Sequence, residues 1–229
     1  MSTSLVTPAA TSARANLITL TDPRAAAAEA YRTLRTNILF AGVEKPIRTL
    51  LVTSPVPDDG KSTTLANLAV TLAQSGHSTI LVDADLRRPA QHTLWGLPND
   101  RGLTSLMLDS SLLANPPLQS TLVEHLHVLS SGPQPPNPAD LLLSKAMDTV
   151  IEALRGRADY VLFDAPPVLA VTDALVLVGK VDGVLLVIKA GTTRRDQAEK
   201  ARDALNRVNA RIIGVALTNA PRDNNSKGY

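Results

Sequence analysis

The residues with the clearest chemistry lie in one short segment between two apolar patterns. Gly60-Lys61-Ser62 follows the β-branched run Thr49–Ser54 and opens the helical pattern Lys61–Gln74. Such a strand–turn–helix segment presents backbone N–H groups and the positive end of a helix, and both attract phosphate. The residues that we expect to bind a nucleotide here are Asp59, Gly60, Lys61, Ser62 and Thr63.

Lys61 and Ser62 are expected to have separate tasks in this segment. The lysine would reach the β- and γ-phosphates, and the serine hydroxyl would ligate Mg²⁺. Pro55 stands where the usual motif has its first glycine, and Asp58 and Asp59 add negative charge. A solvated surface turn is therefore the alternative, but the strand–loop–helix order favours phosphate binding.

Three aspartates follow two further apolar runs. Asp83 and Asp85 come after a run that ends at residue 82, and Asp164 follows a run that ends at residue 163. In an open parallel sheet, the carboxyl ends of the strands form the edge at which ligands bind. The oxygens of Ser62, Asp85 and Asp164 are therefore predicted to converge on one Mg²⁺, a cation that prefers oxygen ligands.

The spacing of Asp83 and Asp85 allows a division of tasks. Two residues apart in an extended segment, their side chains point to the same face. One carboxylate can bind the metal while the other accepts a proton from an incoming hydroxyl group. The alternative is that aspartates at strand ends only cap helices or form turns.

Composition limits the classes of protein to which the chain can belong. It has 229 residues, of which 44% are hydrophobic, and this is enough for a sizeable core in one domain. The absence of cysteine excludes disulfides and thiolate metal sites. The net charge of +2 gives no support for a nucleic-acid partner, and none is expected.

No apolar run approaches the roughly 18–20 residues that cross a bilayer. With no apolar core of a secretory signal at the N-terminus, a soluble cytoplasmic protein is the expectation.

Apolar runs alternate with helical patterns along the chain. We expect strands at 49–54, 79–82, 126–129, 160–163, 183–188 and 212–217, and helices at 23–40, 61–74, 139–155, 171–179 and 194–208. The runs are continuously apolar, which indicates strands buried on both faces. The predicted fold class is α/β, a doubly wound, mostly parallel sheet of the three-layer α/β/α P-loop NTPase type.

One domain is expected to span residues 23–220. Residues 1–22 are polar, small and aperiodic and are predicted to form a flexible arm, and residues 221–229 a flexible tail that ends at Tyr229. The helix expected over 23–40 carries Glu29, Arg32 and Arg35, whose spacing places their charges on one stripe. An ordinary solvated face is the alternative to a contact surface.

Together these motifs resemble the bacterial tyrosine kinase family, the cytoplasmic kinases of capsular and exopolysaccharide assembly. Residues Pro57–Thr63 are similar to that family's phosphate loop, and Asp83–Pro89 to its second Walker motif. Asp164–Pro167 is similar to its Walker B motif. Residues 132–142 resemble its Pro-Pro-Asn-Pro segment, with Asp140 where glutamate is usual. The resemblance covers about residues 23–220.

The resemblance implies an ATP-dependent kinase that phosphorylates protein tyrosine and controls polysaccharide synthesis and export. ATP and Mg²⁺ are the implied cofactors. Lys61, Asp83 and Asp85 would be catalytic, with Asp83 as the base on the tyrosine hydroxyl. The implied metal-binding residues are Ser62, Asp85 and Asp164. Asn219 occupies the position at which related P-loop proteins bind adenine, and a turn residue before a proline is the alternative.

The resemblance also implies partners. Glu29, Arg32 and Arg35 would make the subunit contacts of a homo-oligomeric ring. A membrane-bound polysaccharide co-polymerase would supply an activating tail and attach this cytoplasmic chain to the membrane. The chain has three tyrosines, and Tyr229, at its end, is the expected phosphoacceptor beside tyrosines of partner proteins.

Two other functions stay open at this point. A nucleotide-switched ATPase of the ParA or MinD kind would usually carry a lysine where this chain has Val56. A kinase-like regulatory subunit that binds ATP without phosphorylating tyrosine agrees with the low tyrosine content. Formation of phosphotyrosine, release of phosphate alone, or neither would distinguish the three.

Overall fold

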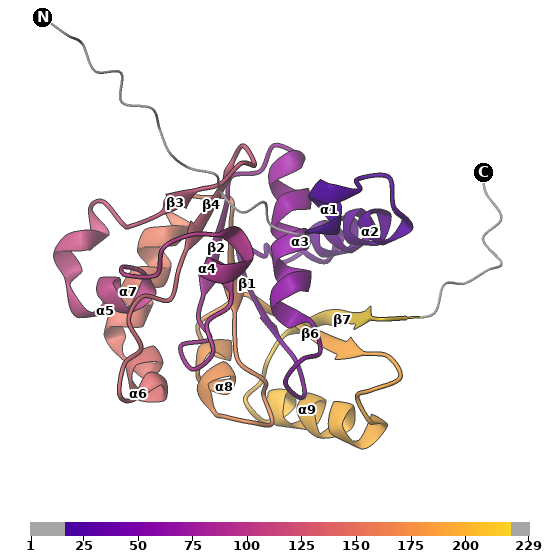
Figure 1. Cartoon of the computed structure of the whole chain (residues 1–229). Helices are drawn as coiled ribbons and strands as arrows, with labels where there is room; N and C mark the ends of the chain where they lie inside the picture. The colour runs from indigo at the N-terminus through magenta and orange to yellow at the C-terminus, as the bar shows by residue number, and fades with distance from the viewer. Residues whose placement is uncertain (1–16, 221–229) are drawn as a thin grey trace, which may run out of the picture.

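A seven-stranded sheet forms the centre of the protein, and helices cover both of its faces (Figure 1). The computed structural model describes residues 17–220. The strands are β1 (Thr49–Thr53), β2 (Thr79–Asp83), β3 (Gln119–Ser120), β4 (Leu126–Leu129), β5 (Tyr160–Asp164), β6 (Gly183–Lys189) and β7 (Ile212–Thr218). The helices are α1 (Ile18–Thr21), α2 (Ala26–Ala41), α3 (Lys61–Gln74), α4 (Gln91–Trp95), α5 (Leu103–Leu108), η1 (Ser110–Leu113), α6 (Pro138–Leu143), α7 (Lys145–Arg155), α8 (Asp173–Val178) and α9 (Arg195–Arg207).

The strand order β3-β4-β2-β5-β1-β6-β7 is that of a doubly wound sheet, and the predicted fold class is confirmed. All pairings are parallel except that of β3 with β4. Every residue of β1 and β2 is buried, as their continuous apolar runs predict for strands covered on both faces. Edge strand β7 is only partly buried.

Two separate apolar clusters fill the space above and below the sheet. One contains buried residues of α3, Leu17, Ile38 of α2 and Trp95 of α4. The other contains buried residues of α5, α6, α7, α8 and α9. The protein is therefore a three-layer α/β/α sandwich, in which α1, α2 and α3 lie on one face and α6 to α9 on the other (Figure 1).

The pairing of β5 with both β1 and β2 determines where the predicted chemistry meets. Asp83, the last residue of β2, lies opposite Asp164, the last residue of β5. Asp164 also lies opposite Val52 of β1, the strand that precedes the predicted phosphate loop. The loop and the carboxylates therefore leave the sheet at one edge, on adjacent strands.

Three features differ from the expectations above. Residues 17–22 are not a loose arm, because they include α1 and Leu17 is fully buried. The helix expected over 139–155 is broken at Ser144, whose ψ of 158° is extended and whose hydroxyl bonds to the Leu141 carbonyl. The stretch between β2 and β4 holds α4, α5, η1 and β3, which lack a clear sequence period. Residues 1–16 and 221–229 lie outside the described part.

Helix α1 is joined to α3 by polar contacts that a sequence pattern cannot show. The Thr19 backbone N–H and hydroxyl both donate to Oδ1 of Asn67, at 3.1 and 2.8 Å. Thr19 and Asn67 are both buried, so these bonds stay shielded from water.

None of the helices within residues 17–220 is long and apolar enough to cross a membrane.

Leu17→Ala tests whether the segment before α2 belongs to the core. Removing a fully buried leucine side chain leaves a cavity and typically costs about 2–5 kcal/mol. Leu122→Ala is the matched control, because Leu122 is 75% exposed and its truncation should change stability by less than about 0.5 kcal/mol. Urea unfolding measures both, and equal midpoints for the two variants would show that residue 17 does not contribute to the core.

Candidate active site

The loop between β1 and α3 has the backbone shape that a phosphate loop requires. Gly60 caps α3 with a φ of 86°, in the left-handed region that glycine adopts without strain. A Cβ at this position would lie 3.4 Å from the Thr218 methyl group. Asp58 also has a positive φ, of 64°, which aspartate tolerates better than most residues. The turn therefore presents its backbone at the carboxyl edge of the sheet.

The Asp59 carboxylate does not face the open side of the loop. Its Oδ1 accepts a hydrogen bond of 2.6 Å from the Thr193 hydroxyl, and its carbonyl accepts one of 2.8 Å from the Thr218 hydroxyl. Asp59 is buried and does not line the adjacent cavity. The nucleotide contact predicted for Asp59 is therefore left to its backbone. Its side chain ties the loop to the segment after β6, and its backbone carbonyl ties the loop to the end of β7.

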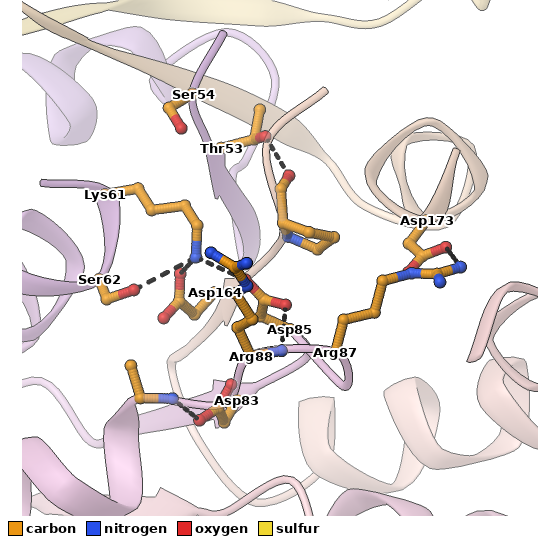
Figure 2. Close-up of polar contacts among 12 residues, drawn as sticks. Thr53, Ser54, Lys61, Ser62, Asp83, Asp85, Arg87, Arg88, Asp164 and Asp173 are labelled. Atoms are coloured by element: carbon orange, nitrogen blue, oxygen red, sulfur yellow. Dashed lines mark hydrogen bonds and ion pairs between the residues drawn. The ribbon is translucent and has the colours of Figure 1, made fainter. Parts of the chain in front are cut away.

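Lys61 is the point at which the predicted residues meet. Its Nζ lies 2.9 Å from Oδ2 of Asp85, 3.1 Å from Oδ1 of Asp164 and 3.2 Å from Oγ of Ser62 (Figure 2). Burial would lower the pKa of Lys61, but the Asp164 and Asp85 carboxylates outweigh burial, so the pKa is raised. The ammonium group is therefore positively charged at neutral pH.

The oxygens around Lys61 Nζ suit a magnesium ion. Two carboxylates and a hydroxyl converge on one small region, and Mg²⁺ is bound in proteins by such oxygens together with water and phosphate. Residues 17–220 contain no group of three or more His, Cys, Asp or Glu side chains that could hold a metal by themselves. An ion at this position would therefore need phosphate oxygens and water among its ligands.

Asp83 lies beside this cluster but has different contacts. Its Oδ2 accepts hydrogen bonds from the backbone N–H groups of Ala90 and Gln91, at 2.9 and 2.8 Å, while its buried Oδ1 has no partner among the described residues. In Figure 2 the Asp83 carboxylate is turned toward a backbone N–H group rather than toward Lys61. Burial, with the Asp164 charge second, raises the pKa of Asp83 well above its ordinary value.

The position of Asp83 bears on its predicted role. The side chain is fully buried and does not line the cavity at the phosphate loop, whereas Asp85 does. This geometry supports a positioning role at the start of α4. The base role assigned to Asp83 stays a prediction.

Gln91 is a site residue that sequence reasoning missed. Its Nε2 donates to Oδ2 of Asp164 at 2.8 Å and to the Ser62 carbonyl at 3.2 Å. Its Oε1 accepts from the Trp95 indole at 3.3 Å. Gln91 therefore fixes the second oxygen of Asp164, while the first faces Lys61. The sequence around residue 91 contains no motif or period that would indicate whether this glutamine is buried or exposed.

The cavity in front of the phosphate loop has a volume of about 470 Å³. The loop forms one wall, the segment after β2 a second, and the segment after β5 a third. Its lining residues are Pro57, Asp58, Gly60, Lys61, Ser62, Thr63, Asp85, Arg87, Arg88, Ala90, Pro166, Pro167, Ala170 and Val171. A concave site whose lining combines charged side chains with apolar ones is suited to a small anionic ligand.

Asn219 lies apart from this cavity. It has a positive φ of 52°, and its side-chain N–H₂ donates to the Ala190 carbonyl at 3.3 Å. It lines a second cavity of about 570 Å³ between α2 and β7, together with Tyr31 and Thr64. Its adenine contact stays a prediction.

The charged stripe on α2 is only partly open to a partner. Glu29 and Arg32 form an ion pair of 2.6 Å within the helix, and Arg32 also donates to the Pro23 carbonyl. Arg35 donates to the Thr71 carbonyl of α3 at 2.9 Å. Arg35 therefore has a role inside its own chain, and the subunit contacts predicted for these residues are untested. The predicted phosphoacceptor, Tyr229, lies outside the described residues.

Comparisons with known proteins show the family of the chain. The family described as ParA, NUBPL iron-transfer P-loop NTPase, matches residues 47–220. Tyrosine-protein kinase YwqD of Bacillus subtilis is 44% identical over 215 residues, which cover 93% of this chain and 90% of that protein. The putative tyrosine-protein kinase CapB of Staphylococcus aureus is 37% identical and 90% of each chain is covered. The chain belongs to the bacterial tyrosine-protein kinases.

Solved structures support the same assignment. The chimerical protein CapA2B2 superposes with a TM-score of 0.85 at 37% identity, over 90% of both chains. The kinase domain of Escherichia coli tyrosine kinase ETK has a TM-score of 0.81 at 32% identity, over 93% of this chain and 84% of that one. MinD of Pyrococcus horikoshii, complexed with Mg-ADP, has a TM-score of 0.62 at 23% identity and shares the fold alone. The P-loop NTPase domain of this tyrosine kinase is thus built like that of the positioning ATPases.

Asp83→Asn should stabilise this tyrosine kinase near neutral pH. Between the ordinary pKa of 3.8 and the raised pKa, the folded protein holds a proton on Asp83 that the unfolded chain releases. Wild-type stability therefore falls as the pH rises through this window. Asparagine keeps an oxygen for the Ala90 and Gln91 N–H groups but cannot ionise.

Thermal unfolding of the nucleotide-free protein over a pH series measures this difference. The variant should melt above wild type at about pH 8, and the gap should close as the pH falls toward 4. Asp100→Asn, at an exposed position, is the control and should show no such trend. A variant that melts at or below wild type at every pH would contradict a buried, protonated Asp83.

Proposed function

We propose that the chain transfers the γ-phosphoryl group of ATP to protein tyrosine, with Mg²⁺ as its cofactor. The convergence of Ser62, Asp85 and Asp164 within 3.2 Å of Lys61 Nζ carries this proposal. The reaction needs little covalent chemistry from the protein, because catalysis of phosphoryl transfer consists mostly of positioning and charge stabilisation. Both can come from groups that already lie together at one sheet edge.

Each residue of the cluster has a specific task in this proposal. Lys61 exchanges its carboxylate partners for the β- and γ-phosphates, and the backbone from Gly60 to Thr63 holds them. Ser62, Asp85 and Asp164 would hold Mg²⁺, which neutralises charge on the phosphates when bound. Gln91 keeps Asp164 oriented through its amide.

The proton of the acceptor tyrosine needs a carboxylate, since a tyrosine hydroxyl has an ordinary pKa near 10. Asp83 was predicted for this role, but its raised pKa keeps a proton on it, and it would have to lose that proton before it could accept another. Asp85 is the aspartate of this pair that lines the cavity. Asn219 and the cavity that it lines with Tyr31 would receive the adenine.

The partners and the setting belong to the same proposal. The resemblance to kinases of capsular and exopolysaccharide assembly supports a role in regulating polysaccharide export. A membrane-bound co-polymerase would activate the chain and hold it at the cytoplasmic side of the membrane. The Glu29–Arg32 face of α2 would contact the next subunit of a ring, and Tyr229 of one subunit would be phosphorylated by another.

Lys61→Met should abolish most ATP binding and all transfer of γ-label to tyrosine. Methionine keeps an unbranched side chain, one atom shorter than that of lysine, but removes the charge that phosphates require. Lys200→Met, at an exposed position on α9, is the control and should behave as wild type. Because the change leaves Asp85 and Asp164 without their ammonium partner, a melting curve should accompany the binding measurement.

The label itself separates the possible functions. We expect it on Tyr229 or on a partner's tyrosine, with the membrane protein's cytoplasmic peptide added. Release of phosphate without phosphotyrosine would indicate a ParA-like switch instead. Unchanged ATP affinity in Lys61→Met would contradict the assigned site.

Arg32→Ala should lower the mass of the assembly measured by light scattering. Arg32 is exposed enough to reach a neighbour, whereas Arg35→Ala would also remove the bond to Thr71 of α3 and loosen the subunit itself. Arg207→Ala, on the exposed end of α9, is the control. If Arg32→Ala has the same mass as wild type, α2 does not form the subunit contact.

A further inference from the structure

Two consecutive arginines that line the cavity have different surroundings. Arg87 is held by Asp173, whose carboxylate is fully buried and accepts two hydrogen bonds, from Nε at 2.7 Å and from Nη2 at 3.0 Å. Such a bidentate pair fixes the guanidinium group in one orientation. The Arg88 side chain has no hydrogen bond or ion pair within residues 17–220 and is exposed. One arginine is thus part of the fold, and the next carries an uncompensated charge.

The backbone of Arg88 is nevertheless fixed at the centre of the site. Its N–H donates to Oδ1 of Asp85 at 3.0 Å, while the other oxygen of Asp85 faces Lys61. Arg88 lines the same cavity as Lys61 and Ser62. In Figure 2 its side chain extends from the segment after β2 toward the side on which Lys61 lies. A long, charged side chain with an anchored backbone can reach a phosphate bound by the loop.

We propose that Arg88 is a catalytic residue that contacts the γ-phosphoryl group during its transfer. This inference rests on the proposed function. In the transfer, the tyrosine oxygen forms a bond to the γ-phosphorus, and the bond from that phosphorus to the β–γ bridging oxygen breaks. The bonding electrons leave with ADP, and the tyrosine proton passes to a carboxylate. Negative charge is spread over the three equatorial oxygens in the transition state, which a guanidinium group matches in charge and in planar geometry.

This role explains why the Arg88 side chain has no partner among the described residues. An ion pair with a neighbouring carboxylate would neutralise the guanidinium and hold it away from the phosphate. The hydrogen bond from its backbone N–H to Asp85 holds Arg88 next to an aspartate that would bind the metal. The charge that stabilises the transition state is therefore supplied from within the same subunit.

Arg88→Ala, Arg88→Lys and the control Arg24→Ala, at an exposed position near the start of α2, test the inference. In Arg88→Ala, kcat for transfer should fall on the order of 10³-fold, as loss of a catalytic arginine does in related phosphoryl transfers. The KM for ATP and the melting temperature should stay near wild type. Arg88→Lys should recover only part of the rate, because lysine lacks the planar fork.

Nucleotide binding provides a second readout that needs no turnover. Wild type should bind ADP with aluminium fluoride and Mg²⁺ more tightly than ADP with Mg²⁺ alone, since the fluoride complex mimics the transferring group. Arg88→Ala should lose this difference and keep its affinity for ADP. The measurement needs no acceptor tyrosine. It therefore tests the role of Arg88 even if the wild-type protein transfers no phosphate to tyrosine. An unchanged preference for the fluoride complex, or a raised KM for the acceptor peptide with unchanged kcat, would overturn the inference.

Discussion

The ammonium group of Lys61 is the interaction on which the rest of the site depends. Asp164 at the end of β5 and Asp85 just after β2 both contact Lys61 Nζ, and these two buried carboxylates would repel one another without a cation. Lys61 supplies that charge, and the two carboxylates in turn raise its pKa despite burial. A buried pair of this kind contributes little net stability, but removing one partner is costly. The cluster is therefore suited to exchanging partners, because phosphates can replace the carboxylates at Lys61 and a metal ion can replace Lys61 at the carboxylates.

The sheet order brings these charges together. Because β5 lies between β1 and β2, the phosphate loop and both groups of aspartates leave the same edge on adjacent strands. Hydrogen bonds then fix the loops that follow. The Thr193 hydroxyl holds Asp59, the Thr53 hydroxyl donates to the Pro166 carbonyl at 2.7 Å, and the Gln91 amide joins Ser62 to Asp164. Each loop of the site is thus hydrogen-bonded to a segment that follows a different strand. These bonds hold the charged side chains of the site in position.

The sequence predicted those parts of the structure that depend on local pattern. The helix over Lys61–Gln74 was predicted with its observed bounds, and the strands were found because continuous apolar runs indicate burial on both faces. The meeting of Ser62, Asp85 and Asp164 followed from the rule that parallel strands share a carboxyl edge. The features that the sequence could not show depend on partners far along the chain. Helix α1 is held by a hydrogen bond from Thr19 to Asn67. Gln91 belongs to the site because its amide donates to Asp164. The side chain of Arg87, unlike that of Arg88, is paired with a carboxylate, that of Asp173.

A crystal structure with Mg²⁺ and a non-hydrolysable ATP analogue would test the central role of Lys61 most directly. We expect Lys61 Nζ on the β- and γ-phosphates, and a metal ion with a Ser62 ligand at about 2.0–2.1 Å, bound directly or through water to Asp85 and Asp164. A nucleotide bound elsewhere on the protein, with Lys61 still paired to both aspartates, would contradict the proposed site.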